Sequence, residues 1–359
     1  MWPAMTQQQQ WQSHQRQGCA GTVLGQVQQH LQELVAGLSR KLRDATPQAV
    51  SNSLRACAQL RVYPAELFAA LDSQQQWSRL LPAFNRQDLA NTALACGEVD
   101  HRDEQLLRLL LQQALQLQEA GGSTGKLNSW EVCHICWSVA VLDFQQLASS
   151  VIKLVEAAAS VQQQWMRFGS EGLVQLHQAH LWLLDKQPLV GGRGLAGALT
   201  EQQLQQCIQA AAQMLLITAA ESPSQFERDV FAALQRLTRA GALSWRQAPQ
   251  QEQLAVPDNA CLIDIAGVTA AGVRLAIEVD GPYHFLWPNG RLNGPTQHRN
   301  RVLAARGCAV VSVRYTEWAD LKGAQDKQQH LLKLIKTAIQ QQRRRERPLE
   351  QQAPTISTQ

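Results

Sequence analysis

A repeat with a period near 40 residues constrains the fold of this 359-residue chain more than any other feature. Three segments can be superimposed: TPQAVSNSLRACAQL from Thr46, NRQDLANTALACGEV from Asn85 and NSWEVCHICWSVAVL from Asn128. A fainter fourth copy, GSEGLVQLHQAHLWLL, begins at Gly169. The aligned apolar positions recur at intervals of 39, 43 and 41 residues: Val50, Leu89, Val132 and Leu173.

Each copy carries the pattern of a helix. It opens with a capping residue or proline and continues with apolar residues at helical spacing, and a second helical stretch follows. Two helices per period of this length are typical of an α-solenoid, whose units bury their apolar faces against their neighbours. We therefore predict an α-helical repeat solenoid of about four units over residues 41–190, followed by a linker and helix over 191–221.

These repeats resemble the octotricopeptide repeat family, the helical-repeat RNA-binding proteins of organelles, in phrases such as RQDLANTALACGEV. The resemblance covers about residues 40–190. It implies that the first helix of each unit presents polar side chains to the edges of RNA bases. The polar residues two positions after the aligned apolar ones would be these contacts: Asn52, Asn91, His134 and Gln175. The alternative is that they are solvated or cap neighbouring turns.

Charge is unevenly divided along the chain. Residues 1–221 hold 15 Lys and Arg against 17 Asp and Glu, whereas the residues from Ser222 onward hold 18 against 12. The basic surplus predicts a polyanionic partner for the C-terminal part. The slight negative balance of the first part keeps open a protein-interaction scaffold that grips a protein partner.

The C-terminal part, residues 222–340, shows the order α-β-β-α-β-α, which predicts a small mixed α/β sheet covered by helices. Its second strand is LAIEVDGPYHF, which carries two carboxylates. Because side chains alternate along a strand, Glu278 and Asp280 share one face, and Gly281-Pro282 ends the strand beside them. Strand ends beside turns are where α/β sheets usually hold their sites.

This part is similar to the RAP domain, found in organellar RNA-processing and translation factors, commonly after helical repeats. The resembling segments are LIDIA, LAIEVDGPYHF, LNGPTQHRNRVLAARG and VVSVRYTEW. RAP domains are similar in turn to the restriction-endonuclease-like, PD-(D/E)xK fold, which uses an Asp on one strand and Glu-x-Lys on the next.

That resemblance implies a metal site, with Asp264 and Glu278 in the Asp and Glu positions and Asp280 in place of the lysine. Asp264, Glu278 and Asp280 would hold Mg²⁺ or Mn²⁺. His284, Arg299 or Arg301 would then replace the missing cation, and Glu227 would add a fourth carboxylate. The alternative is structural: Glu278 and Asp280 pair with arginines such as Arg299 and Arg301.

Several further residues are candidates for RNA contact, for which no cofactor is required. Tyr283, Phe285 and Trp287 offer aromatic rings to unpaired bases, although Phe285 could equally anchor its loop. We expect a basic, disordered tail over residues 341–359, in which RRRER, including Arg343, Arg344 and Arg345, meets RNA phosphates. The remaining candidate RNA contacts are Arg299 and Arg301.

Residues 1–40 form a low-complexity, glutamine-rich segment. Its first acidic residue is Glu33, and the part before Glu33 holds a single arginine, Arg16. This composition is equivocal for a targeting peptide. The family resemblance points to the chloroplast or the mitochondrion. The isolated cysteines suit a reducing compartment, and no apolar run is long enough for a membrane span.

The sequence thus predicts an organellar RNA-binding protein acting in post-transcriptional control, through transcript stability, processing or translation. Two alternatives remain: a metal-dependent endoribonuclease using Asp264, Glu278 and Asp280 with His284, and a protein-interaction scaffold.

Overall fold

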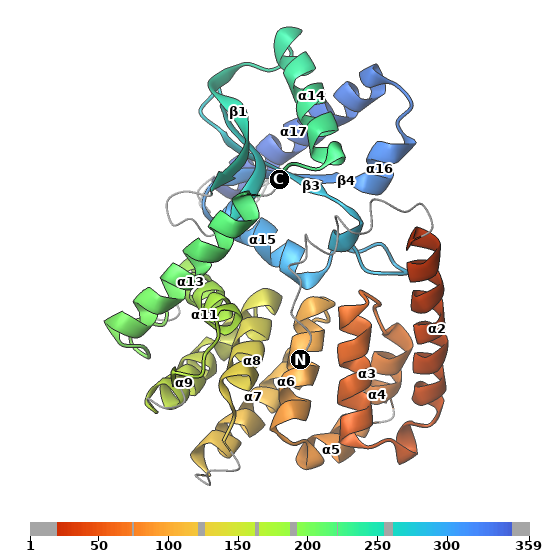
Figure 1. Cartoon of the computed structure of the whole chain (residues 1–359), viewed down its shortest axis with the longest axis vertical. Helices are drawn as coiled ribbons and strands as arrows, with labels where there is room; N and C mark the ends of the chain where they lie inside the picture. Colours follow the sequence, from red (N-terminus) through yellow and green to blue (C-terminus); the bar gives the residue numbers. More distant parts are fainter. Residues whose placement is uncertain are drawn as a thin grey trace, which may run out of the picture. The chain divides into compact units, whose positions relative to one another are not determined.

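The computed structural model describes residues 20–73, 75–120, 126–161, 165–186, 192–220, 222–254 and 261–346. Over these ranges the chain is mostly helical, with a mixed sheet in its C-terminal third (Figure 1). The described residues fall into two compact units. The first contains the chain up to Met214 together with Phe285–His298, and the second contains Leu215–His284 and the residues from Arg299 onward.

The first helices of the four repeats form one layer of the first unit. They are α3 (Pro47–Gln59), α6 (Arg86–Glu98), α8 (Ser129–Leu142) and α11 (Ser170–Asp185). α6 packs between α3 and α8, and α8 also packs on α11 (Figure 1). The helix expected at each repeat is therefore present, and each lies beside its neighbour in the series.

The second helices form the other layer: α4 (Ala65–Ser73), α7 (Glu104–Glu119), α9 (Ala148–Ala159) and α13 (Glu201–Ala219). Short helices α5 (Gln76–Leu80), η1 (Leu42–Asp44), η2 (Leu81–Ala83) and η3 (Gln145–Leu147) lie in the connections. We expected α13 to belong to a linker segment, but Cys207 is buried in the helical core and Gln203 donates to the Ala159 carbonyl at 3.1 Å. α13 therefore completes the fourth helical pair; residues 187–191 of the expected linker lie outside the described ranges.

The segment expected to be low-complexity also contributes a helix, α2 (Ala20–Arg40). α2 packs on α4, buries Val35, and donates from the Gln28 amide to the Leu60 carbonyl at 3.1 Å. The apolar residues Leu31, Val35 and Leu38 recur at helical spacing, which explains why a glutamine-rich stretch folds here. Residues 1–19, where a targeting peptide was considered, lie outside the described ranges.

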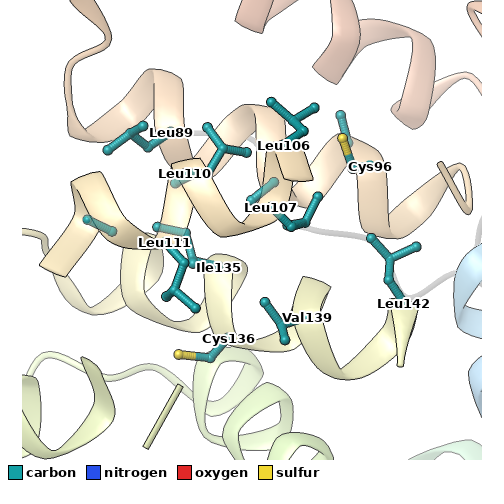
Figure 2. Packing of buried hydrophobic residues seen from close by; sticks show 14 of the residues in the cluster. Leu89, Cys96, Leu106, Leu107, Leu110, Leu111, Ile135, Cys136, Val139 and Leu142 are labelled. Carbon is teal, nitrogen blue, oxygen red and sulfur yellow. The ribbon is translucent and has the colours of Figure 1, made fainter. Parts of the chain in front are cut away.

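The core of the first unit runs between the two helical layers (Figure 2). Leu107 and Leu110 of α7 are fully buried against Ile135 and Val139 of α8. Truncating one such leucine to alanine costs about 2–5 kcal/mol, because lost transfer energy and a residual cavity add. Polar bonds between successive repeats supplement this packing: the Trp137 indole donates to Gln178 at 2.6 Å.

The segment Phe285–His298 belongs to the first unit, although the sequence placed it inside the C-terminal domain. Leu286 is buried in the helical core. The Tyr63 amide donates to the Trp287 carbonyl at 2.9 Å, and the Trp287 amide donates to the Arg61 carbonyl at 2.8 Å. Backbone pairing and core burial therefore tie this segment to the first repeat.

The sheet of the second unit consists of β1 (Trp245–Leu254), β2 (Leu262–Thr269), β3 (Arg274–Asp280) and β4 (Cys308–Arg314), in that order. β1 and β2 are antiparallel, β2 and β3 are antiparallel, and β3 and β4 are parallel. The helix between β3 and β4 is α15 (Gly294–Ala305). This confirms the expected mixed sheet and the final strand pair bridged by a helix.

The strand β1 was missed because its sequence, WRQAPQQEQL, is polar and contains Pro249. Proline and a run of glutamines argue against a strand when read locally. Pairing with β2 along an edge of the sheet decides its conformation, and the register shifts between Trp245 and Gln250 accommodate the proline. Tertiary pairing thus overrides local propensity here.

Helices cover both faces of the sheet. On one face, α14 (Gln225–Arg239) and α17 (Ala324–Glu346) pack against Ile277 and Val279, with α16 (Tyr315–Asp320) beside them (Figure 1). On the other face, Leu303 of α15 packs on Ala276 and Cys308. The alternation of β3 therefore turns Glu278 and Asp280 toward the α15 face.

Two helix starts are fixed by side-chain caps, and the tail differs from expectation. Ser224 caps α14 in a capping box with Glu227. Asn293 caps α15 by accepting from the Thr296 amide at 3.0 Å. α17 continues to Glu346 because the buried residues on its inner face extend to Gln342, so residues 341–346 are helical. Residues 347–359 lie outside the described ranges.

Candidate functional site

A shallow hollow of about 650 Å³ opens between the N-terminal ends of α6 and α8, on the layer of first helices. Two of the four residues predicted to contact bases, Asn91 and His134, line it. The full lining is Asn85, Arg86, Gln87, Ala90, Asn91, Leu117, Asn128, Trp130, Glu131 and His134. Amide groups and aromatic rings thus meet at one place on this face.

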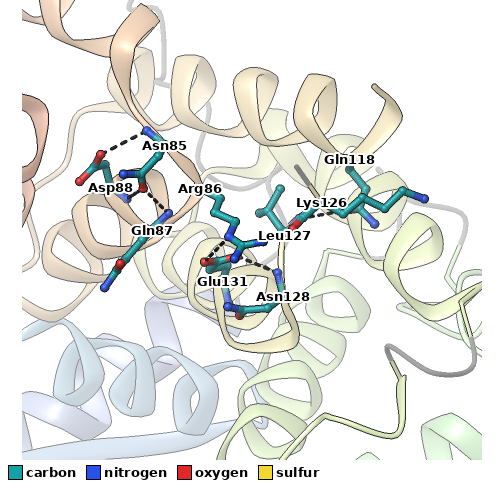
Figure 3. Close-up of polar contacts among 9 residues, drawn as sticks. All are labelled: Asn85, Arg86, Gln87, Asp88, Gln118, Lys126, Leu127, Asn128 and Glu131. Atoms are coloured by element: carbon teal, nitrogen blue, oxygen red, sulfur yellow. Dashed lines mark hydrogen bonds and ion pairs between the residues drawn. The ribbon is translucent and has the colours of Figure 1, made fainter. Parts of the chain in front are cut away.

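Two capping boxes build the rim of the hollow (Figure 3). In α6 the Asn85 side chain accepts from the Asp88 backbone amide, and the Asp88 side chain accepts from the Asn85 backbone amide. In α8 the side chains of Asn128 and Glu131 accept from each other's backbone amides in the same way. Each box satisfies otherwise unpaired amide groups at a helix start and fixes the first turn. The geometry of the rim is therefore set by residues that the sequence places at helix caps.

Arg86 connects the two helix starts across the rim. Its guanidinium donates to the Lys126 carbonyl at 2.9 Å, and its Nε lies 3.4 Å from Glu131 Oε1 (Figure 3). Glu131 is buried, and burial raises its pKa while its bond to Asn128 and the charge of Arg86 oppose the rise. The hollow consequently carries little net charge at its rim.

Trp130 and His134 form an aromatic wall. The Trp130 side chain is 42% exposed, and its ring meets the His134 ring edge-on at 5.7 Å between centroids. Burial, followed by the charge of Arg55, lowers the pKa of His134 to about 4. The imidazole is therefore neutral near pH 7, which suits hydrogen bonding or stacking with an uncharged base. Sequence reasoning missed Trp130; an aromatic residue in the first turn of a repeat's first helix was the available signal.

The other two predicted base-contacting residues have different environments. Asn52 is exposed on α3 and accepts from the Asn91 amide at 3.4 Å. Gln175 of α11 is only 9% exposed, and its Oε1 has no hydrogen-bond partner among the described residues. The structure thus brings Asn52, Asn91 and His134 onto neighbouring helices and buries Gln175.

The second unit gathers the predicted carboxylates on the α15 face of the sheet, with Glu278 and Asp280 fully buried and Asp264 partly buried. Arg299 of α15 enters among them. Its Nη2 lies 2.8 Å from Glu278 Oε2 and 3.0 Å from Asp280 Oδ1. Asp264 Oδ2 accepts from the Val279 amide at 2.7 Å. These contacts match the structural alternative for Arg299.

Electrostatics in this cluster follow from burial and from nearby guanidinium groups, of which Arg299 has the largest effect. Burial raises the pKa of Glu278 well above its usual value, and it raises the pKa of Asp264 and Asp280. Arg299 opposes all three shifts. Burial alone would lower the pKa of Arg299, but the three carboxylates outweigh it and raise the pKa further. Arg299 is therefore charged at any working pH.

The remaining residues considered for this site lie at its edge. His284, in η4 (Pro282–His284), has Nδ1 at 3.7 Å from Asp280 Oδ1. Ser312 Oγ donates to Asp280 Oδ2. Glu227 forms the capping box of α14, so its carboxylate is used there. Arg301 lies two residues beyond Arg299 and is partly buried.

The donor set does not fit a resident divalent cation. Mg²⁺ requires near-octahedral oxygen ligands about 2.1 Å away, whereas a guanidinium nitrogen already bridges Glu278 and Asp280. Among the described residues, no group of three or more His, Cys, Asp or Glu side chains is arranged to hold a metal ion. The expected role of Asp264, Glu278 and Asp280 as metal ligands therefore has no support from this geometry.

The aromatic loop residues divide into different environments. Phe285 is buried and Trp287 packs against the helical core, so both anchor the segment in the first unit. Tyr283 is partly exposed. Of these three residues, Tyr283 is therefore the candidate for stacking on RNA bases.

The basic residues of α17 from Lys333 onward are exposed on the side away from its buried face. Lys333, Lys336, Arg343 and Arg344 recur at spacings that place them along one helical face, with Arg345 beside them. The described helix has no acidic residue between Asp326 and Glu346. This forms a continuous cationic stripe on the second unit, hereafter the α17 stripe (Lys333, Lys336, Arg343 and Arg344).

A mixed four-stranded sheet with helices on both faces, joined in one chain to paired helical repeats, defines the structural class. Within it, residues 277–334 match the RAP domain, so the chain contains a RAP domain that includes the end of β3, α15 and β4. The chain is also 36% identical over 62 residues to a protein of Oryza sativa subsp. japonica called "RAP domain-containing protein, chloroplastic". That similarity spans 17% of this chain and 10% of the rice protein.

No helix within the described ranges has the length and hydrophobicity needed to cross a membrane.

Proposed function

We propose that this chain is an RNA-binding protein of the chloroplast that acts on transcript stability, processing or translation. The RAP domain and the chloroplastic name of the rice relative support the compartment and the general RNA-related role. The helical repeats, which we propose to be octotricopeptide-like, supply the surface that selects the RNA.

The observation that carries the proposal is the hollow between α6 and α8. Trp130 offers an exposed indole face, and aromatic stacking contributes about 1–3 kcal/mol per base. Neutral His134 and the amide of Asn91 lie in the same hollow and can pair with the edge of a stacked base. One unpaired base, held by stacking and by polar pairing, is small enough to enter the hollow and suits its low charge.

The two units divide the task in this proposal. The hollow has little net charge, so it discriminates between bases, whereas the α17 stripe attracts phosphates without regard to sequence. This division explains how a repeat unit with a slightly acidic balance can belong to an RNA-binding protein.

The test is RNA binding by the full chain with Trp130→Ala, measured by fluorescence anisotropy on a single-stranded RNA selected from a random pool. We expect a loss of about 1–3 kcal/mol in binding free energy, with Trp130→Phe retaining most of the affinity. Met166→Ala, at a side chain that is 79% exposed, is the matched control and should leave affinity unchanged. Equal affinities of wild type and Trp130→Ala would contradict the proposal, and absence of any RNA binding would favour the protein scaffold.

A further inference from the structure

We infer that Arg299 is the built-in cation of the RAP-domain carboxylates, occupying the place a divalent metal would need and locking α15 to the sheet. This inference goes beyond RNA binding and does not depend on it. It also separates this chain from a metal-dependent nuclease that would use the same carboxylates.

Most of the carboxylate oxygens in this cluster already have a partner within the chain. Asp264 Oδ2 is used by the Val279 amide, and Asp280 Oδ2 is used by Ser312. Glu278 Oε2 and Asp280 Oδ1 both face the same Nη2 of Arg299, at 2.8 and 3.0 Å. The bridging position between the two β3 carboxylates is therefore filled by a nitrogen that cannot ligate a metal.

The negative charge of the three carboxylates needs compensation inside the protein. Glu278 and Asp280 are fully buried, and Asp264 adds a third carboxylate that interacts with both of them. A buried, ionised carboxylate without a cation partner is strongly unfavourable, so each of these groups must either take up a proton or have a positive charge beside it. Arg299 is fixed on the helix that covers this face, and it supplies that charge from within the chain. No external ion is required.

Arg299 also attaches α15 to the sheet. β3 and β4 are parallel neighbours, and α15 is the crossover between them. The apolar contact of α15 with this face includes Leu303, which packs on Ala276 and Cys308. The ion pairs of Arg299 add a directional attachment that fixes the rotation of α15 about its own axis.

Removing the Arg299 guanidinium should uncover a metal site. In Arg299→Ala, three carboxylates would face the vacated space without a cation. Oxygen-only sites of this kind select Mg²⁺ or Mn²⁺. The wild-type chain should ignore Mn²⁺, whereas the variant should acquire a requirement for it.

The experiment compares the full-length wild type, Arg299→Ala and Arg301→Ala by thermal unfolding in millimolar MnCl₂ and in EDTA. Free Mn²⁺ is followed by electron paramagnetic resonance in parallel. We expect the melting temperature of wild type to be the same in MnCl₂ as in EDTA, and the same to hold for Arg301→Ala. Neither protein should deplete Mn²⁺ from solution. Arg299→Ala should melt lower in EDTA, recover in MnCl₂ and deplete Mn²⁺ from solution. Mn²⁺ binding by wild type that disappears in Glu278→Gln would overturn the inference.

If Arg299→Ala does not fold, a second pair of variants keeps the inference testable. Arg299→Met leaves the carboxylates unpaired, whereas Arg299→Met combined with Glu278→Gln removes one of them. We expect the double variant to be more stable than Arg299→Met alone, because the two changes offset each other. A double variant less stable than Arg299→Met would show that Arg299 does not act through the carboxylates.

Discussion

Asp100 and Arg291 are 191 positions apart in the sequence, yet Arg291 Nη2 lies 3.2 Å from Asp100 Oδ2. Asp100 is 2% exposed and follows α6 in a left-handed backbone conformation, with φ of 51°. Gln297 donates to the same oxygen at 2.6 Å. One buried carboxylate of the second repeat thus holds two residues of the segment Phe285–His298.

Asp100→Asn should destabilise the chain by about 2–3 kcal/mol, because the amide replaces one acceptor oxygen with a donor and no longer attracts Arg291 by charge, while the left-handed backbone is retained. Urea denaturation followed by circular dichroism measures this. Arg108→Ala, which breaks the exposed pair with Glu104, is the control and should cost no more than about 0.5 kcal/mol. Equal effects of the two variants would mean that the Asp100 contacts contribute no more than a surface ion pair.

Asn91→Ala should cost about 1–3 kcal/mol in binding free energy on the selected RNA and much less on a scrambled RNA of the same length. The amide lies in the hollow beside Trp130 and His134, where it can pair with a base edge. Anisotropy titrations with both RNAs distinguish this from a loss of folding. A similar loss on both RNAs would mark Asn91 as a phosphate-contacting or structural residue.

The dependence of affinity on salt should arise largely from the α17 stripe. Changing Lys333, Lys336, Arg343 and Arg344 together to glutamine should reduce the slope of log K against log [salt] by up to about 3, since each contact with single-stranded RNA contributes about 0.7. These side chains are exposed on a helix, so the fold should tolerate the change. A slope that stays at the wild-type value would exclude the α17 stripe from the RNA-binding surface.

His134→Gln should make the chain less sensitive to acid. The pKa of His134 is lowered from 6.5 to about 4 by burial, so below pH 6.5 the unfolded chain binds a proton that the folded chain does not. The stability associated with the neutral ring is therefore present above pH 6.5 and is lost as pH falls toward 4.

The measurement is the difference in free energy of unfolding between wild type and His134→Gln at several pH values from 7 to 4. We expect this difference to shift in favour of the variant by about 1–3 kcal/mol on acidification. Buried carboxylates such as Glu278 have the opposite sign of dependence, but they are common to both proteins and cancel in the difference. A difference that does not change with pH would contradict the assigned neutral state of His134.

Much of the fold is encoded in local patterns that can be recognised in the sequence. Asn85 and Asn128, each followed three residues later by an acidic residue, specify capping boxes and so the starts of α6 and α8. Apolar periodicity specifies the repeat helices, and the alternation of β3 places Glu278 and Asp280 on one face. These features depend on residues a few positions apart, so the sequence determined them without reference to the rest of the chain.

The tertiary structure decided which partner each of these groups meets. WRQAPQQEQL becomes β1 because β2 offers an edge to pair with, and Arg299 meets Glu278 and Asp280 because of the way α15 packs on the sheet. Trp130, Asn91 and His134 meet because successive repeats stack side by side. Local patterns determine whether a segment forms a helix or a strand and which of its side chains share a face. Contacts between distant residues depend on how whole elements pack, and only the packed structure contains that information.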